Sequence, residues 1–396
     1  MPNERPAVCI IVENLPVPFD RRVWQEARSL RDAGYRVSVI CPKGKGYERS
    51  YELCEGIEIY RHGIWEASGA VGYLLEYSWA ITAEFFLALK VYFRTRFQIL
   101  QACNPPDLIF LIALFFKLFG VRFIFDHHDL NPELYEAKLG KRSGFLYALL
   151  CLAERLTYRT ANISIAPNES FLEVALARDG MKPERVFIVR SCPDLKDIRF
   201  FPSPELKDGK PYLVAYLGVM GQQEGLDLLL EAIEYIVCKR HRQDVSFVLV
   251  GGGTEKPHIQ ALCAAKGLDE VVKFTGKLKG ADFAPYLSTA DVCVAPDPKN
   301  PMNDKSTMNK ILDYMAYGRP TVLFDLTEGR RSAGDAALYA RPNDPLDFAE
   351  QILKLLDSES LRRQLGECGQ KRIEELLNWE TERKRLLAAY AAALKC

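Results

Sequence analysis

The chain lacks most of the features that mark a nucleic-acid-binding, disulfide-rich or metal-binding protein. Its 52 basic residues balance 52 acidic ones, so nothing global attracts nucleic acid and any anion site must be local. None of the 11 cysteines forms a CxxC pair, and most lie inside apolar runs. We therefore expect buried free thiols rather than disulfides or metal ligands, which fits a reducing cytoplasm.

Long, clean apolar runs are also missing. The two nearest stretches, 83–97 and 108–125, are interrupted by charged residues. The N-terminal residues lack the basic and apolar regions of a secretion signal, so we predict a cytoplasmic protein. Both stretches mix aromatic and basic residues, which favours contact with the inner face of the membrane as one interpretation. For 108–125 we favour the other interpretation, burial against the chain's own sheet.

Short apolar strands alternate with helices from end to end. This alternation predicts an α/β protein with parallel sheets covered by helices on both faces. The expected strands lie at 7–13, 36–42, 55–63, 121–126, 161–167, 185–191, 211–218, 245–253, 271–276, 290–296, 319–325 and 336–340. The expected helices lie at 20–35, 73–97, 108–120, 226–237, 305–317, 346–356 and 379–395.

The length of the chain suits two domains rather than one core. Residues 200–211 are polar and rich in proline and glycine, which favours a linker there. We predict one domain over 1–203, a second over 204–377 and a terminal helix over 378–396. Ligands of open α/β sheets bind at the carboxyl ends of the strands, so site residues are expected at those ends.

Several segments, in order along nearly the whole chain, carry a family resemblance. KSTMNKILDYMAYGRPTVLFD (305–325) resembles the donor-site motif of glycosyltransferase family 4, whose members have the GT-B fold. Other segments resembling the C-terminal domain of that family are 216–232, 249–278, 289–296 and 328–345. The segments 19–42, 125–133 and 188–194 resemble bacterial members that build surface polysaccharides.

The resemblance implies a retaining, metal-independent enzyme that transfers a hexosyl or N-acetylhexosaminyl group and uses no cofactor. The implied donor is a nucleotide-sugar, with a UDP-sugar favoured over a GDP-sugar, and the implied acceptor is a lipid-linked sugar or a polysaccharide. The GT-B fold has two Rossmann-like, doubly wound domains that face each other across a cleft. The acceptor is expected on the N-terminal domain, the donor on the C-terminal one, and the terminal helix packed back on the first domain.

The donor site implied by the resemblance lies at 305–313. Asp313 matches the second glutamate of the family's E-x7-E motif, which holds the ribose hydroxyls, whereas Lys305 replaces the first, which contacts the donor sugar. We expect Ser306 and Thr307 to cap the helix, whose free N–H groups would suit a diphosphate. Lys310 is either a phosphate contact or a surface lysine, and the alternative for Asp313 is a solvated carboxylate.

Glu224 is a second departure, because many family members have a lysine there that neutralises the diphosphate. The cations that could replace it are Lys305, Lys310, Arg330 and Arg331. Further donor-site candidates are Gly218, Thr275 and Lys277, which lie in resembling segments, and Glu328, which lies in a loop after a strand.

Two adjacent histidines, His127 and His128, follow a buried strand, and an extended backbone would send them to opposite sides. By its D-x-H spacing, His128 matches the family histidine that approaches the donor sugar. Pairing with a carboxylate such as Asp129 would tune its charge near neutral pH. The alternative is a structural histidine at the strand end. No third ligand with the usual spacing accompanies the pair, so we expect no metal.

Asp20, Arg21 and Arg22 lead the first helix, where the family's usual glycine pair is missing. One interpretation is a phosphate or acceptor contact. The other is Asp20 as N-cap residue, followed by two exposed arginines.

Different classes of activity remain open. An active transferase is favoured, while Lys305 and Glu224 are reasons to consider a transfer-inactive scaffold or binding subunit of a glycan-assembly complex. An epimerase would need acid–base groups that face one donor carbon, and no such set is evident. A dehydrogenase is excluded, because NLPVPF follows the first strand in place of a glycine fingerprint.

Overall fold

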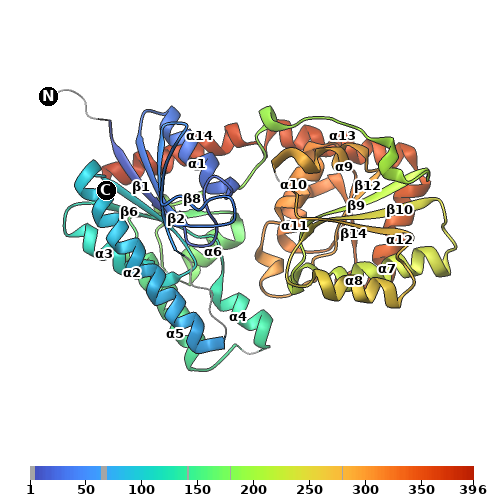
Figure 1. The fold of residues 1–396 in the computed structure, drawn as a ribbon, viewed down its shortest axis with the longest axis horizontal. Helices are drawn as coiled ribbons and strands as arrows, with labels where there is room; N and C mark the ends of the chain where they lie inside the picture. Colours follow the sequence, from blue (N-terminus) through green and yellow to red (C-terminus); the bar gives the residue numbers. More distant parts are fainter. Residues whose placement is uncertain (1–4, 64–68, 141, 179, 279) are drawn as a thin grey trace. The chain divides into compact units, whose positions relative to one another are not determined.

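A computed structural model describes residues 5–63, 69–140, 142–178, 180–278 and 280–396 (Figure 1). The chain forms two compact units, one of Met1–Ser191 with Glu380–Cys396 and one of Cys192–Trp379. The segment 200–211 that we expected to link the domains therefore belongs to the second unit. There the N–H of Phe201 donates to Ser288 Oγ at 3.0 Å.

The first unit is built on a sheet with the strand order β3-β4-β2-β1-β5-β6-β7-β8. Neighbouring strands pair in parallel except β3 and β4. The strand order reverses beside β1, and the carboxyl ends at such a reversal form the ligand edge of an open sheet. The strands are β1 (Ala7–Ile11), β2 (Arg36–Pro42), β3 (Tyr51–Cys54), β4 (Ile57–His62), β5 (Ile99–Cys103), β6 (Arg122–Asp126), β7 (Ile163–Ala166) and β8 (Val186–Ile188).

Helices cover both faces of this sheet. The crossovers to the two sides of β1 run in opposite directions, so right-handed connections put α1 on one face and α2, α3, α5 and α6 on the other. Phe116, Phe123 and Tyr158 belong to the core under the second group. The helices are α1 (Arg21–Asp32), α2 (Gly69–Thr95), α3 (Phe110–Lys117), α4 (Asn131–Leu139), α5 (Phe145–Thr160) and α6 (Glu169–Ala177).

The last helix, α14 (Trp379–Lys395), belongs to the first unit from Glu380 onward. The buried Tyr390 donates its hydroxyl hydrogen to Gln101 Oε1 on β5. The N–H of Arg190 donates to Glu382 Oε2 at 2.9 Å. The end of the chain is thus tied to the sheet edge where β5 and β8 end.

The second unit has a fully parallel sheet in the order β11-β10-β9-β12-β13-β14. Its order reverses beside β9, which again marks a ligand edge. The strands are β9 (Tyr212–Val219), β10 (Val245–Gly252), β11 (Val272–Gly276), β12 (Val292–Ala295), β13 (Thr321–Phe324) and β14 (Ala337–Ala340). The helices are α7 (Leu226–Glu234), α8 (Lys256–Ala265), α9 (Ala284–Thr289), α10 (Asn309–Ala316), α11 (Thr327–Ala333), α12 (Pro345–Asp357) and α13 (Glu359–Glu375).

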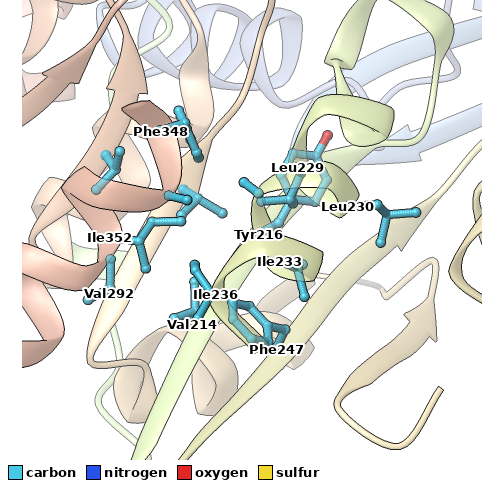
Figure 2. Close-up of a cluster of buried hydrophobic side chains, with 14 of the residues drawn as sticks. Val214, Tyr216, Leu229, Leu230, Ile233, Ile236, Phe247, Val292, Phe348 and Ile352 are labelled. Carbon is cyan, nitrogen blue, oxygen red and sulfur yellow. The ribbon is translucent and has the colours of Figure 1, made fainter. Parts of the chain in front are cut away.

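The core of the second unit joins the sheet to α7 and α12. Figure 2 shows Leu229 and Ile233 of α7, Phe247 of β10 and Phe348 and Ile352 of α12 within this cluster of buried side chains. Burying such side chains is the dominant favourable contribution to folding. The core therefore fixes the strands whose carboxyl ends carry the site.

Two glycines allow the loops at this edge to pack closely. A Cβ on Gly251, at φ +140°, would lie 1.8 Å from Gly218 O, and one on Gly225, at φ +66°, would lie 2.2 Å from Pro296 O. Only glycine fits such positions. The end of β10 is thereby held against the end of β9, and the turn before α7 is held against the segment after β12.

Candidate active site

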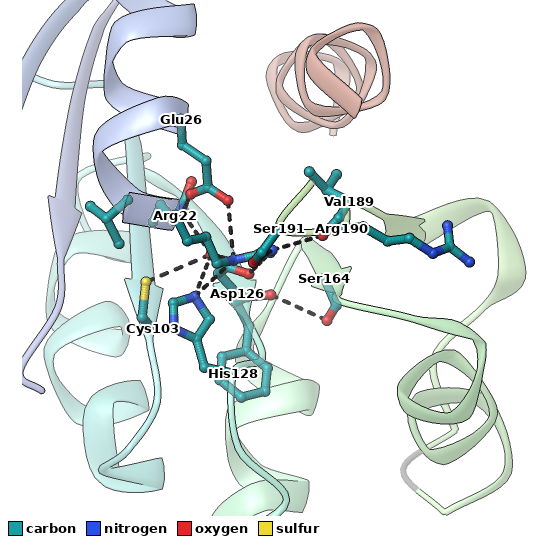
Figure 3. Close-up of polar contacts among 12 residues, drawn as sticks. Arg22, Glu26, Cys103, Asp126, His128, Ser164, Val189, Arg190 and Ser191 are labelled. Atoms are coloured by element: carbon teal, nitrogen blue, oxygen red, sulfur yellow. Dashed lines mark hydrogen bonds and ion pairs between the residues drawn. The ribbon is translucent and has the colours of Figure 1, made fainter. Parts of the chain in front are cut away.

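The ligand edge of the first unit holds a buried ion pair between Arg22 of α1 and Asp126 of β6 (Figure 3). Arg22 Nη2 lies 2.7 Å from Asp126 Oδ1, and Nη1 donates to Val189 O at 2.8 Å. Glu26, one turn along α1, lies 3.3 Å from Arg22 Nε. Arg22 therefore ties α1 to β6 and to the loop after β8.

His128 is held against this pair. Its Nε2 lies 2.8 Å from Asp126 Oδ2 and 3.1 Å from Arg22 Nε. Its backbone N–H donates to Asn104 Oδ1 at 2.7 Å, which fixes the loop after β6. His128 Nδ1 makes no hydrogen bond to any residue that the structure describes, so this ring nitrogen is available to a ligand.

The charges of this cluster follow from burial and from the ion pair. Burial lowers the pKa of His128, but the Asp126 carboxylate outweighs burial, and the pKa is raised. Burial would raise the pKa of Asp126, but Arg22 and His128 hold that pKa well below its usual range. Burial and the charge of Asp126 raise the pKa of Glu26 to about 8. The cluster can therefore present an imidazolium N–H beside an ionised Asp126.

His127 lies in a different environment. Its Nδ1 is 2.6 Å from the hydroxyl of Tyr158, and its ring stacks on Phe125 with centroids 5.1 Å apart. Burial lowers the pKa of His127 to about 3, so the ring is neutral near physiological pH. His127 therefore belongs to the core, and His128 belongs to the ligand edge.

The carboxylate beside His128 is Asp126, which we did not single out from the sequence. Asp129, which we named instead, contacts Asn104 through its backbone, where its N–H donates to Asn104 Oδ1 at 3.2 Å. The D-x-H spacing carried the signal for Asp126, because alternate residues near a strand end share a side of the sheet.

The three residues that lead α1 take different positions. Asp20 is the N-cap residue and its Oδ1 accepts from Val23 N at 3.0 Å, while Arg21 is exposed. The expectation that both arginines are exposed is wrong for Arg22. A buried Asp126 needs a counter-ion, and Arg22 provides it.

Cys103, Asp126 and His128 offer ligand atoms that lie within 4.8 Å of one another, a group that could hold a metal ion. The guanidinium of Arg22 lies against both Asp126 and His128. A metal ion there would face this positive charge at short range. The set therefore does not fit a metal ion while Arg22 keeps its place.

The ligand edge of the second unit holds a buried lysine, Lys310, in the first turn of α10. Its Nζ lies 2.8 Å from Asp297 Oδ1, contacts Glu224 Oε2, and sits 4.9 Å from the centre of the Tyr216 ring. Burial lowers the pKa of Lys310, but the carboxylates of Asp297 and Glu224 outweigh burial and raise it. Burial raises the pKa of Asp297 to about 6. Lys310 is therefore a buried cation shared by two carboxylates rather than a surface lysine.

The helix α10 begins at Asn309 rather than at Lys305. Residues Asn303–Lys305 form a short 3-10 turn, and Ser306 Oγ donates to Met302 O at 2.8 Å. The N-cap residue is Met308, which makes no side-chain capping bond. The prediction that Ser306 and Thr307 cap α10 is therefore wrong, because the preceding turn engages the Ser306 hydroxyl and delays the helix.

The other predicted donor-site residues lie at different distances from this cluster along the sheet. Asp313 is buried in the second turn of α10, although we weighed a solvated carboxylate as its alternative. A Cβ on Gly218 would lie 3.3 Å from Lys310 Cε, so Gly218 borders the lysine. Thr275 is the second-last residue of β11, and Lys277 follows that strand, which lies on the opposite side of β10 from β9.

The two arginines that we considered as phosphate contacts both pair with carboxylates. Arg330 lies 2.8 Å from Asp325 Oδ2 and sits over the Tyr339 ring at 4.1 Å. Arg331 Nη1 donates to the buried Glu328 at 2.7 Å, in the first half of α11. These pairs reduce the positive charge that either arginine presents to a ligand.

Two family models match the chain in succession. Residues 20–196 match the model described as Glycosyltransferase Family 4, and residues 211–358 match the model described as Glycosyl transferases group 1. Alpha-D-kanosaminyltransferase of Streptomyces kanamyceticus is 25% identical over 162 residues, which is 40% of either chain. The matched region spans less than half the length of the curated relatives of this kind.

Solved structures resemble the whole chain in fold. Sucrose-phosphate synthase of Thermosynechococcus elongatus superposes with a TM-score of 0.81 at 19% identity, covering 99% of this chain and all of that one. HepE of Anabaena in complex with UDP-glucose gives a TM-score of 0.71 at 14% identity and covers 98% and 99% of the two chains. The chain therefore has the GT-B fold and belongs to glycosyltransferase family 4.

Proposed function

We propose that the protein is a retaining, metal-independent glycosyltransferase that moves a hexosyl or N-acetylhexosaminyl group from a nucleotide-sugar to a lipid-linked or polysaccharide acceptor. A UDP-sugar is the favoured donor and a GDP-sugar is the alternative. The GT-B neighbour HepE was solved with UDP-glucose, which supports the first choice. We place the reaction in the cytoplasm, at the inner face of the membrane.

The observation that carries this proposal is the position of His128. One ring nitrogen is fixed on Asp126, and the other is available at the ligand edge of the sheet. An imidazolium N–H fixed in this way can donate to a sugar hydroxyl without reorganising as the reaction proceeds. His128 would then contact donor or acceptor sugar, and Asp126 would act as its positioning residue.

The second unit supplies groups suited to the nucleotide. As the bond from sugar C1 to the diphosphate oxygen breaks, charge grows on the leaving phosphate and must be stabilised by protein donors if no metal takes part. Lys310 and the backbone N–H groups at the start of α10, which no side chain caps, would be such donors. Asp313 on the same helix would accept hydrogen bonds from the ribose hydroxyls.

The test is thermal stabilisation of the purified protein by UDP and by GDP in the presence of EDTA. A ligand at a hundred times its Kd stabilises the folded state by about 2.7 kcal/mol. We expect stabilisation by one nucleotide, its loss in Asp313→Asn, and its retention in Asp335→Asn, a control at an exposed carboxylate of the same unit. If neither UDP nor GDP stabilises the protein, the proposal is contradicted.

The pairing of Lys310 with two carboxylates favours a second candidate, a transfer-inactive scaffold or binding subunit of a glycan-assembly complex. A lysine neutralised by Asp297 and Glu224 offers little net charge to a diphosphate. Lys305 in place of the expected glutamate points the same way. Under this alternative neither UDP-sugars nor GDP-sugars are turned over, even at saturating concentration.

A further inference from the structure

Three helices of the first unit form one outer layer on the same face of its sheet (Figure 1). The rings of Phe85 on α2 and Phe115 on α3 lie 5.0 Å apart, and those of Tyr92 and Phe119 lie 5.7 Å apart. The helix α3 also packs against α5. The described side chains of α2, α3 and α5, with the residues that follow α3 as far as Arg122, are called the outer layer below.

The outer layer presents large apolar side chains to solvent. Phe145 is 86% exposed, Leu118 is 81% exposed and Phe93 is 69% exposed. The exposed residues recur on one side of each helix: Trp79, Phe86 and Phe93 on α2, Leu111, Leu114 and Leu118 along α3, and Phe145, Leu149 and Leu152 on α5. Exposed apolar side chains that recur on neighbouring helices are typical of an interaction surface.

We expected residues 108–125 to bury against their own sheet, and this holds for only part of the segment. The inward residues Ile112 and Phe116 do so, and both are buried. Leu111 and Leu114 face outward between them, because residues on one short helix point in all directions. This helix is therefore apolar on the face that packs on the sheet and also on the opposite face, and the opposite face would be stabilised by a second apolar partner.

The exposed charges of the outer layer all have one sign. Lys90, Arg94, Arg155 and Arg159 are exposed. Of the acidic residues on these helices, Glu84 and Glu154 are fully buried, and the side chain of Glu76 on α2 lies outside the described ones. The surface therefore combines exposed phenylalanine and leucine with positive charge.

We propose that the outer layer is a docking surface for an anionic lipid bilayer. Apolar side chains would enter the boundary between headgroups and acyl chains, while basic residues would contact the lipid phosphates. A second copy of the chain is a poorer occupant, because two such surfaces would bring their exposed lysine and arginine side chains together. This proposal rests on the proposed function in one respect, because it names the surface through which the transferase would contact the membrane. Lipid binding can be tested separately from sugar transfer.

No described helix is long and apolar enough to cross a membrane. The contact would therefore lie in the plane of the bilayer surface, with the three helices on it rather than through it. A protein held there would meet lipid-linked acceptors at the depth of their headgroups.

The experiment is sedimentation of the full chain with vesicles of phosphatidylcholine, with and without phosphatidylglycerol. We expect binding to the anionic vesicles, weakened by salt, and little binding to the neutral ones. Replacing both Arg155 and Arg159 by glutamine should lower the partition coefficient about thirtyfold. Phe145→Ser with Leu149→Ser should lower it at least as much.

Matched controls lie in the second unit, where Leu346, Arg363 and Lys371 are exposed. Leu346→Ser, and Arg363→Gln with Lys371→Gln, should bind vesicles like the unchanged protein. Unchanged Tm values of the outer-layer variants would show that they fold. The proposal would be overturned if the unchanged protein did not bind anionic vesicles, or if the outer-layer variants bound them as well as it does.

Two further readouts separate this proposal from its rivals. The first is sedimentation without vesicles. A dimer of the unchanged protein that the outer-layer variants do not form would overturn the proposal and show that a second copy of the chain covers the surface. Nucleotide stabilisation is measured on the same samples. Vesicle binding without any nucleotide binding would support the docking surface and contradict the proposed transferase. Nucleotide binding without vesicle binding would support the transferase and overturn the docking surface.

Discussion

Asp126 Oδ2 lies 2.8 Å from His128 Nε2. The other oxygen of the same carboxylate lies 2.7 Å from Arg22 Nη2. A single buried carboxylate thus orients the imidazole and anchors α1 to the end of β6. His128 is the group that can reach a ligand, and Asp126 acts through it as a positioning residue.

Replacing His128 by glutamine should lower turnover about a hundredfold or more, because a fixed hydrogen-bond donor to the reacting sugar is lost. The Arg22–Asp126 pair remains in this variant, so it should still fold, and its Tm should fall only where His128 is protonated in the unchanged protein. The measurement is nucleoside diphosphate release by purified variants. His258→Gln, at an exposed histidine of the second unit, is the matched control. Full activity in His128→Gln would remove His128 from the site.

Replacing Asp126 by asparagine should both slow turnover and destabilise the first unit. Arg22 would then be buried without its main counter-ion, which costs about 3–5 kcal/mol. Urea unfolding measures this loss. A variant as stable as the unchanged protein would show that Glu26 and Val189 O suffice to hold the arginine.

Protonation of His127 should make the protein sensitive to acid. The ring has an unfolded pKa near 6.5 and a folded pKa of about 3, because burial disfavours the charged form. Between these values the unfolded chain binds a proton that the folded protein does not, so stability is full above pH 6.5 and falls with decreasing pH. The slope from this residue is about 1.4 kcal/mol per pH unit.

This pH dependence can be isolated with His127→Gln, which should show a flatter loss of unfolding free energy between pH 6.5 and pH 3 than the unchanged protein. His128 acts on the other side, since its raised pKa gives stability that is full below its unfolded value near 6.5 and lost as the pH rises through the folded value. Parallel curves for His127→Gln and the unchanged protein would contradict this assignment.

Replacing Glu224 by glutamine should strengthen nucleotide binding. The change removes one of two carboxylates that compete for Lys310, so the lysine can turn its charge to the diphosphate. We expect the Kd of the preferred nucleotide to fall about three- to tenfold, which corresponds to the net gain of one ordinary hydrogen bond. Calorimetric titration measures the Kd. Glu231→Gln, at an exposed carboxylate of α7, should leave it unchanged.

Replacing Gly251 by alanine should damage the ligand edge of the second unit. The new Cβ would lie 1.8 Å from Gly218 O, so the paired ends of β9 and β10 must separate. We expect a destabilisation of about 3 kcal/mol or more and a loss of nucleotide binding. Gly267→Ala, also at positive φ but with open space around it, should cost about 1–2 kcal/mol. Equal Tm values for the two variants would contradict the clash.

The strand–helix alternation predicted much of the fold, because apolar strands buried on both faces stand out in a sequence. The strand β5 (Ile99–Cys103) was not predicted, because Gln101 interrupts its apolar run. That side chain is buried because its Nε2 donates to Glu26 Oε2 at 2.6 Å and to Asp126 Oδ2 at 3.1 Å. A polar residue satisfied by distant partners cannot be distinguished from a loop residue in one sequence.

The residues of the candidate site could also be predicted only in part from the sequence. Lys310, Asp313 and His128 could be proposed because they lie in motifs whose residues are close in the sequence. The pairing of Arg22 with Asp126, and of Glu224 with Lys310, joins residues separated by 104 and 86 positions. Such pairs are set by the order of strands in the sheet, which composition and periodicity do not reveal.

The most direct test of the central claim is release of UDP or GDP from a panel of nucleotide-sugars in EDTA, with membrane lipid extract as acceptor. The account predicts release from one donor, retention of the anomeric configuration in the product, and at least about a hundredfold loss in His128→Gln. Release from no donor, or release that requires a divalent cation, would contradict a metal-independent transferase.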